Sequence, residues 1–135
     1  MGVLLLTVFA FWFAEWYARN DIKEYLIGFI YEHASRAIIR GIVLTIASLW
    51  AVWLTKHAIH VLDLSLYLAY SCAIFWIWFE YRFNSMLNIN DPFYIGDTAW
   101  SDQTLRSLGI TGKTFFVFKI TLLLLFFVLI LLLRY

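Results

Sequence analysis

A series of polar residues at helical spacing lies within residues 57–71, between long apolar stretches. His57, His60 and Asp63 follow one another at intervals of three, and Tyr67 and Tyr70 continue at intervals of four and three. Residues with this spacing share one face of an α-helix. Ionisable groups in an apolar helix are costly, so they normally face a bundle interior, a partner subunit or water. We therefore take His57, His60, Asp63 and Tyr67 as candidate cofactor-binding residues.

This polar stripe has three interpretations. In the first it is structural: His60 donates a hydrogen bond to Asp63, and the tyrosines bond to neighbouring helices. In the second it serves a proton, a quinone or another cofactor, and in the third it forms a seam with a partner subunit. A metal site is not predicted, because His57 and Asp63 are twisted about 120° apart on the helix, so one ion would need distorted geometry or outside ligands.

The positions of the histidines restrict any haem. A bis-histidine haem needs one ligand on each side of the ring, and His57 and His60 share a helix face. His33, the remaining histidine, is expected at the other side of the membrane, about 30 Å away. The chain alone therefore cannot hold such a haem, but a haem b shared with another subunit through His57 or His60 remains an alternative.

A second set of polar groups lies at the opposite ends of the apolar stretches. Lys119 is about 8–9 Å into its expected helix, which is deep for an isolated charge. We expect Lys119 to pair with Glu80 or Glu15 and so to hold helices together. The competing interpretation is that Lys119 extends to the interface, with Glu15 and Glu80 satisfied locally by Arg19 and Arg82.

Residues 107–114 read SLGITGKT and end like a phosphate-binding P-loop. Ser107 replaces the leading glycine, no strand is expected before the segment, and the following helix is apolar. A glycine-containing loop, with Thr111 or Thr114 capping the last helix, explains the same residues. Asp91, Asp97 and Asp102 lie in the same loop and could be metal ligands, but roles in turns and helix caps explain each of them at lower cost. No catalytic constellation is found, so we do not expect an enzyme.

The composition identifies the class of protein. The chain has 135 residues, of which 64% are apolar, 21% aromatic and 14% charged, whereas soluble domains are about 45–50% apolar. The net charge of +1 is much smaller than the positive charge typical of a nucleic-acid-binding domain. A lone cysteine, Cys72, excludes a disulfide framework. The sequence therefore predicts an integral membrane protein of one domain.

The expected fold class is an all-α, polytopic membrane protein, because about 20 apolar residues in a helix cross a bilayer. The second span must include Arg36 and Arg40 in its first turns, where long basic side chains can reach the interface. The first span lacks the basic start and the cleavage site of a signal peptide, so we read it as a retained helix. The four expected spans cover residues 2–18, 34–55, 59–80 and 114–133.

Two polar segments connect these spans. Residues 20–33 have an amphipathic pattern, with Asn20 as a suitable N-cap and Asp21 and Glu24 suited to a first turn by the helix dipole. They are expected either as an interfacial helix or as the extension of one long helix. Glu32 is expected to pair with Arg36. Residues 84–113 form the long polar loop, in which Ser101 could cap a helix over residues 102–108 that Gly109 stops.

The basic residues orient the chain. Eight of the ten fall on the side of the long loop, which predicts that this loop is inside and both termini are outside. Tryptophans cluster at both expected interfaces. The location we expect is a bacterial or mitochondrial inner membrane. The eight residues are Arg19, Lys23, Arg36, Arg40, Arg82, Arg106, Lys113 and Lys119, with Lys56 and Arg134 opposite.

Three functional hypotheses follow. The first is a non-catalytic accessory subunit of a membrane complex, because the spans have little polar lining and few residues suited to catalysis. The second is a haem b- or quinone-binding anchor of a respiratory oxidoreductase, resting on the polar stripe. The third is a self-assembling pore of the holin type. All three have the lipid bilayer and either other transmembrane subunits or further copies of the chain as partners, and none involves nucleic acid.

Overall fold

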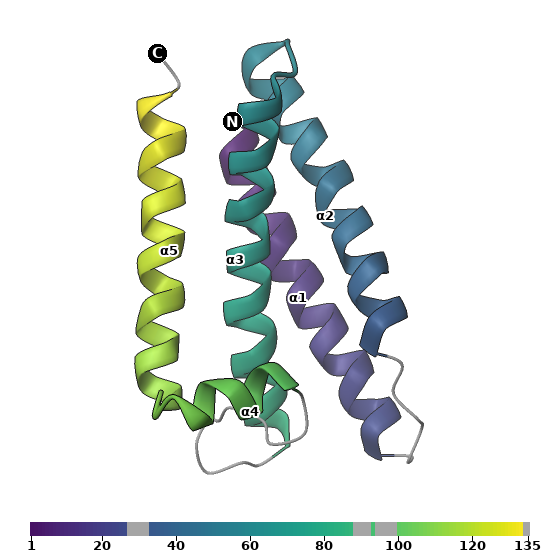
Figure 1. The fold of residues 1–135 in the computed structure, drawn as a ribbon. Coiled ribbons are helices and arrows are strands. Elements are labelled where there is room, and N and C mark those ends of the chain that lie inside the picture. Colours follow the sequence, from purple (N-terminus) through teal and green to yellow (C-terminus); the bar gives the residue numbers. More distant parts are fainter. Residues whose placement is uncertain (27–32, 88–92, 94–99, 134–135) are drawn as a thin grey trace.

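The computed structural model describes residues 1–26, 33–87, 93 and 100–133, and every regular element among them is a helix. Four long helices run alternately up and down, and the short α4 lies across the end where α3 and α5 are linked (Figure 1). The helices are α1 (Gly2–Leu26), α2 (His33–Lys56), α3 (Val61–Met86), α4 (Trp100–Ser107) and α5 (Gly112–Leu132).

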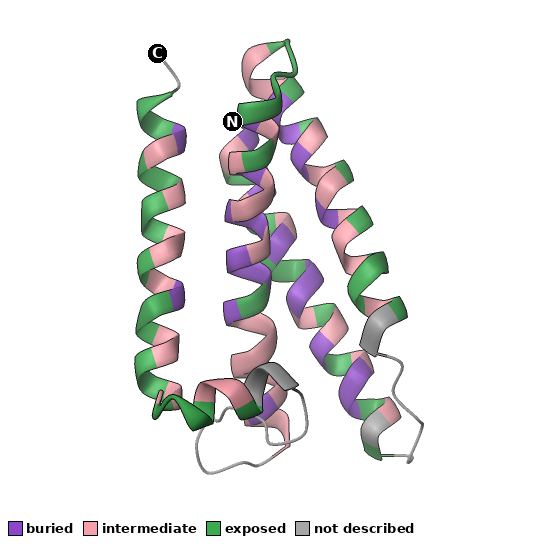
Figure 2. Cartoon of the chain, viewed as in Figure 1, coloured by how far each residue is buried: buried purple, intermediate pink, exposed green. Residues whose placement is uncertain are grey.

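Helix α3 is the centre of the bundle, because it packs against α1, α2 and α5. Helix α1 also packs against α2, whereas the backbone of α5 approaches only α3 among the described helices. Buried positions gather where α1, α2 and α3 face one another, and they are sparse on α5 (Figure 2). Two apolar clusters form this core, one with Leu6, Ala10, Ala51, Val52, Tyr67, Tyr70, Ile74 and Ile130, the other with Phe13, Ala14, Leu44 and Phe75.

Close packing joins α1 to α2 at one end of the bundle. A Cβ atom on Gly2 would lie 2.2 Å from the carbonyl oxygen of Ala51 and 2.3 Å from Oγ1 of Thr55. Glycine therefore permits an approach of the two helices that any larger residue would prevent.

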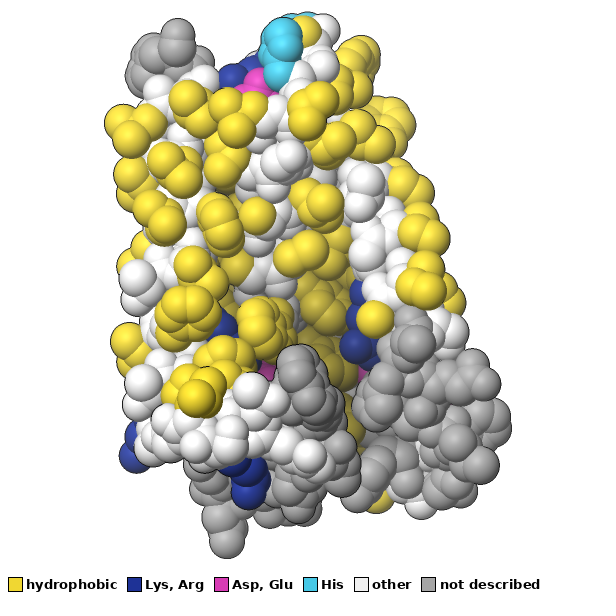
Figure 3. All heavy atoms as spheres, viewed as in Figure 1, with side chains coloured by type: hydrophobic (Ala, Val, Ile, Leu, Met, Phe, Trp, Pro, Cys, Tyr) yellow, Lys and Arg dark blue, Asp and Glu magenta, His cyan; other side chains and the backbone are white. Residues whose placement is uncertain are grey.

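In the described part of the chain, three helices are long and apolar enough to cross a membrane, which is consistent with an integral membrane protein. They are Ser35–Lys56 within α2, Val61–Met86 and Gly112–Leu132. Helix α1 is long but not among them, because its apolar part is followed by charged residues from Glu15 onward. Hydrophobic side chains are spread along the helices on the face seen in Figure 3, and lysine and arginine side chains appear toward the end that carries α4 and at the opposite end beside the histidines.

The structure corrects the expected boundaries in the polar segments. Helix α1 continues without a break through Asn20 to Leu26, so Asn20 is not an N-cap and the described part of this segment extends a long helix. Helix α3 continues to Met86, so Asn84 is a buried helical residue and not the start of the loop. Glu80 pairs with Lys119 of α5 and Arg82 with Glu15 of α1, and these contacts with adjacent helices support α3 beyond its apolar part.

The end of the long loop agrees with its expected turn chemistry. Helix α4 ends at Ser107, and Gly109 then adopts a φ of +70°, which favours glycine after a helix. Thr111 caps α5, because its hydroxyl accepts a hydrogen bond of 3.2 Å from the backbone N–H of Thr114. Ser101, however, lies inside α4 and not before it. Glu32, Asp91 and Asp97 lie outside the described residues, as do the side chains of His33 and Asp102.

Candidate functional site

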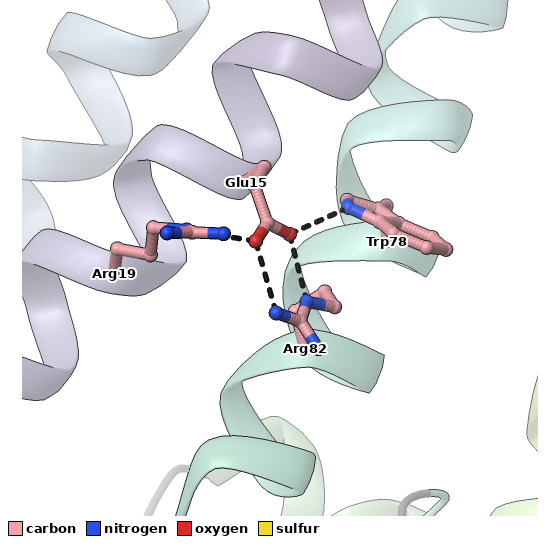
Figure 4. Close-up of polar contacts among 4 residues, drawn as sticks. All are labelled: Glu15, Arg19, Trp78 and Arg82. Carbon is pink, nitrogen blue, oxygen red and sulfur yellow. Dashed lines mark hydrogen bonds and ion pairs between the residues drawn. The ribbon is translucent and has the colours of Figure 1, made fainter.

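Glu15 of α1 is the centre of a polar cluster with α3 (Figure 4). Arg82 donates two hydrogen bonds to the carboxylate, from Nε at 2.8 Å and from an Nη atom at 3.0 Å. Trp78 Nε1 donates a third at 3.0 Å, and Arg19, one turn along α1, donates a fourth at 2.8 Å. A bidentate arginine pair of this kind fixes geometry as well as charge. The cluster therefore sets the register of α1 against α3.

Lys119 of α5 forms an ion pair with Glu80 of α3. The lysine side chain is only 2% exposed, and its ammonium lies 4.4 Å from the ring centre of Trp76 and 4.3 Å from that of Phe115. Ring faces attract cations, so the two aromatics and the carboxylate together replace the water that the ammonium loses. Of the two partners expected for Lys119, the structure places Glu80 against it, while Glu15 is engaged by Arg82 and Trp78.

Asp21 forms a third cluster, which joins α1 to α2. Its side chain is fully buried and pairs with both Arg36 and Arg40, and Arg36 also pairs with Glu24. The guanidinium of Arg40 lies 4.7 Å from the ring centre of Tyr17 and 4.6 Å from that of Phe79 on α3. A fully buried carboxylate between two cations is stable only because both remain in place.

Sequence reasoning assigned Asp21 a role at the start of a helix and did not find this cluster. Asp21 and Glu24 are one turn apart on α1, and Arg36 and Arg40 are one turn apart on α2. Complementary charges at helical spacing on both sides of a short connection were the signal that could have revealed the pairing.

At the opposite end of the bundle, Lys56 of α2 pairs with the buried Asp63 of α3 at 2.7 Å. Its ammonium also donates a hydrogen bond of 2.8 Å to the carbonyl oxygen of Leu133, at the end of α5. A cation at this position donates a hydrogen bond to a carbonyl that has no partner within the helix. It is also attracted by the negative end of the α5 helix dipole. Asp63 therefore bonds to Lys56, and not to His60 as the structural interpretation of the stripe expected.

The four candidate cofactor-binding residues do not converge. His57 and His60 are exposed in the turn between α2 and α3, where His57 adopts a φ of +54° and its ring stands edge-on to Trp53 at 6.0 Å. Asp63 and Tyr67 are buried within the bundle instead. The rest of the stripe bonds to neighbouring helices: Tyr70 to the Thr7 hydroxyl at 2.9 Å, and Ser71 to Ser48 at 3.2 Å.

Within the described residues, no three side chains of histidine, cysteine, aspartate or glutamate are grouped as a metal site requires. Residues 107–114 are divided between the end of α4, a turn and the first residues of α5. That geometry is a helix–turn–helix connection and lacks the strand that a P-loop follows.

Every packed pair of described helices is joined by at least one ion pair. Four pairs of these helices pack against each other, and three of the ion pairs lie between α1 and α2. Glu15–Arg82 joins α1 to α3, Asp21–Arg40 joins α1 to α2, Lys56–Asp63 joins α2 to α3, and Lys119–Glu80 joins α3 to α5. The described charges at these interfaces are thus used to connect helices.

The fold and these interfaces define an all-helical protein with three helices able to cross a membrane. In comparisons with known proteins, no family model matches the chain, and no curated protein or solved structure matches it either.

Proposed function

We propose that the protein is a non-catalytic accessory subunit of a larger membrane complex, in which α1 serves as a fourth span. The observation that carries this proposal is that every packed pair of described helices is joined by at least one ion pair. Ion pairs between apolar helices specify register and neighbour more than they add stability. Such an arrangement suits a scaffold that holds its helices in fixed positions.

The placement of α1 as a span is supported by its neighbours. Helix α1 packs against both α2 and α3, two of the helices able to cross a membrane. Two of its carboxylates face these neighbours, since Glu15 bonds to Arg82 and Asp21 to Arg36 and Arg40. Charges that are paired inside a bundle are far less costly in a membrane than isolated ones.

In this proposal a partner protein packs against the outward face of α5. Only Lys119 and Ile130 of α5 are buried, although α5 is the most apolar of the long helices. Val117, Leu124 and Val128 lie at positions i, i+7 and i+11 and are all exposed, so they share the face opposite Lys119. A helix whose backbone approaches only one other described helix gains most from packing against a further transmembrane helix.

Site-specific photocrosslinking in the native membrane tests this proposal. Benzoylphenylalanine at Leu124 is expected to give one discrete crosslinked product with another transmembrane protein, because α5 faces that partner. The matched control is Ile42 on α2, which is 55% exposed where Leu124 is 58% exposed. Crosslinks to lipid only from Leu124, or identical protein products from both positions, would overturn the proposal. A product with twice the mass of the chain would indicate self-assembly instead.

A further inference from the structure

Two hollows lie along the seam between α1 and α2. The first is apolar, has a volume of about 350 Å³, and is lined by Leu5 and Phe9 of α1 and by Val43, Ile46, Ala47 and Trp50 of α2. The second, which we call the polar hollow because most of its lining residues are charged or polar, has a volume of about 400 Å³. Its lining includes Trp16, Asn20, Lys23 and Glu24 of α1 with Arg36 and Ile39 of α2.

Helical spacing places the two hollows on one face of the seam. On α2, Arg36, Ile39, Val43, Ile46 and Trp50 follow at i, i+3, i+7, i+10 and i+14, which is one continuous stripe. On α1, Phe9, Trp16, Asn20 and Lys23 follow with the same kind of spacing. Ile39 of the polar hollow and Val43 of the apolar one are a single turn apart, so the hollows are neighbours.

The dimensions of the seam match one leaflet of a bilayer. Ile39 and Trp50 are about 16 Å apart along α2 at a rise of 1.5 Å per residue. Half of the hydrocarbon core is about 15 Å thick. An acyl chain that begins at the polar hollow would therefore lie along the apolar one to its end.

The polar hollow offers hydrogen-bond donors suited to a phosphate group. The Lys23 side chain is exposed and makes no ion pair with another described residue. Asn20 and Trp16 present an amide and an indole N–H one and two turns earlier on the same stripe of α1. Lys23, Arg36 and Arg40 together outnumber the carboxylates Asp21 and Glu24 by one charge among the described residues.

We propose that the α1–α2 seam binds one anionic membrane phospholipid. Its phosphate lies at Lys23, Asn20 and Trp16, and an acyl chain lies in the hollow lined by Phe9, Val43 and Trp50. Anionic lipids attract basic residues near the membrane surface, and tryptophan is typical of the headgroup level. The proposal rests on α1 being in the membrane but is independent of a partner at α5.

A membrane lipid explains both hollows better than a second protein helix. A transmembrane helix on this face would cover Lys23 and Glu24 with apolar residues and would desolvate both charges. A phospholipid has the same division into a charged end and an apolar end that the seam has.

Native mass spectrometry of the purified full chain in mild detergent tests the proposal, with phosphatidylglycerol and phosphatidylcholine as probes. The wild type is expected to retain one phosphatidylglycerol in preference to phosphatidylcholine. Lys23→Gln is expected to reduce that preference about five-fold, equivalent to about 1 kcal/mol for one basic residue near an anionic surface. Ile46→Trp fills the apolar hollow and should lower the occupancy of both lipids.

Two matched controls complete the experiment. Lys113→Gln removes an exposed lysine at the start of α5, and Ile42→Trp enlarges an exposed residue of α2 outside the hollow. Neither control should change lipid occupancy. Equal binding of both lipids by the wild type, or equal effects of the Lys23 and Lys113 variants, would overturn the proposal. So would a dimer that Ile46→Trp dissociates, because a second copy would then occupy the seam.

Discussion

Asp21→Asn is expected to lower the free energy of unfolding by about 3–5 kcal/mol, the range typical of breaking a buried ion pair by removing one partner. The substitution keeps the size of a fully buried side chain but removes the charge between Arg36 and Arg40. Those two guanidiniums then repel each other at the α1–α2 interface with less compensation. An SDS titration of the protein in mixed micelles, followed by circular dichroism, measures the change.

Glu24→Gln is the matched control for Asp21→Asn. It removes a carboxylate that also pairs with Arg36, but from a side chain that is 35% exposed. Partly exposed pairs are worth about 0–1 kcal/mol, so the expected loss is correspondingly small. If both variants lost the same stability, the buried position of Asp21 would not have the importance we assign to it.

Lys119→Leu is expected to lower the free energy of unfolding by about 2–3 kcal/mol, because it leaves Glu80 without its cation beside an apolar helix. The expected loss is less than for Asp21, since Glu80 is partly exposed and can reach water. The same titration measures it. Release of α5 from α3 should precede unfolding of the other helices, because the backbone of α5 approaches only α3 among the described helices.

The double variant Lys119→Leu with Glu80→Leu separates the charge effect from packing. Replacing both partners by apolar residues of similar size is often close to neutral, so the double variant should recover most of the lost stability. Unchanged stability and unchanged helix association in Lys119→Leu alone would show that Lys119 only extends to the interface and holds nothing.

The sequence was sufficient to identify the long apolar helices, because hydrophobic length is a property of single segments. Residues 34–55 and 114–133 were expected as helices, and α2 and α5 cover nearly the same ranges. The N-cap of α5 at Thr111 and the end of the preceding helix before Gly109 could also be predicted, since both depend on local backbone chemistry. The confirmed part is an all-helical protein with three helices able to cross a membrane.

The partners of charged residues were harder to predict, because they depend on which helices are neighbours. The spacing of Asp63 after His60 indicated a bond within one helix, whereas the structure pairs Asp63 with Lys56 across the turn. Asp21 was similarly given a local role, although its partners lie on α2. The spacing of residues along one helix predicts the face on which each residue lies. It does not predict which residue of a neighbouring helix each one contacts.

The fourth span is the claim on which both the accessory-subunit proposal and the lipid site depend, and labelling from one side of the membrane tests it most directly. In a Cys72→Ser background, single cysteines are placed in an N-terminal tag, at His60 and at Lys113, and are labelled with an impermeant maleimide. If α1 crosses the membrane, the tag is labelled from the same side as His60→Cys and from the side opposite to Lys113→Cys. Labelling of the tag together with Lys113→Cys would contradict the four-span arrangement.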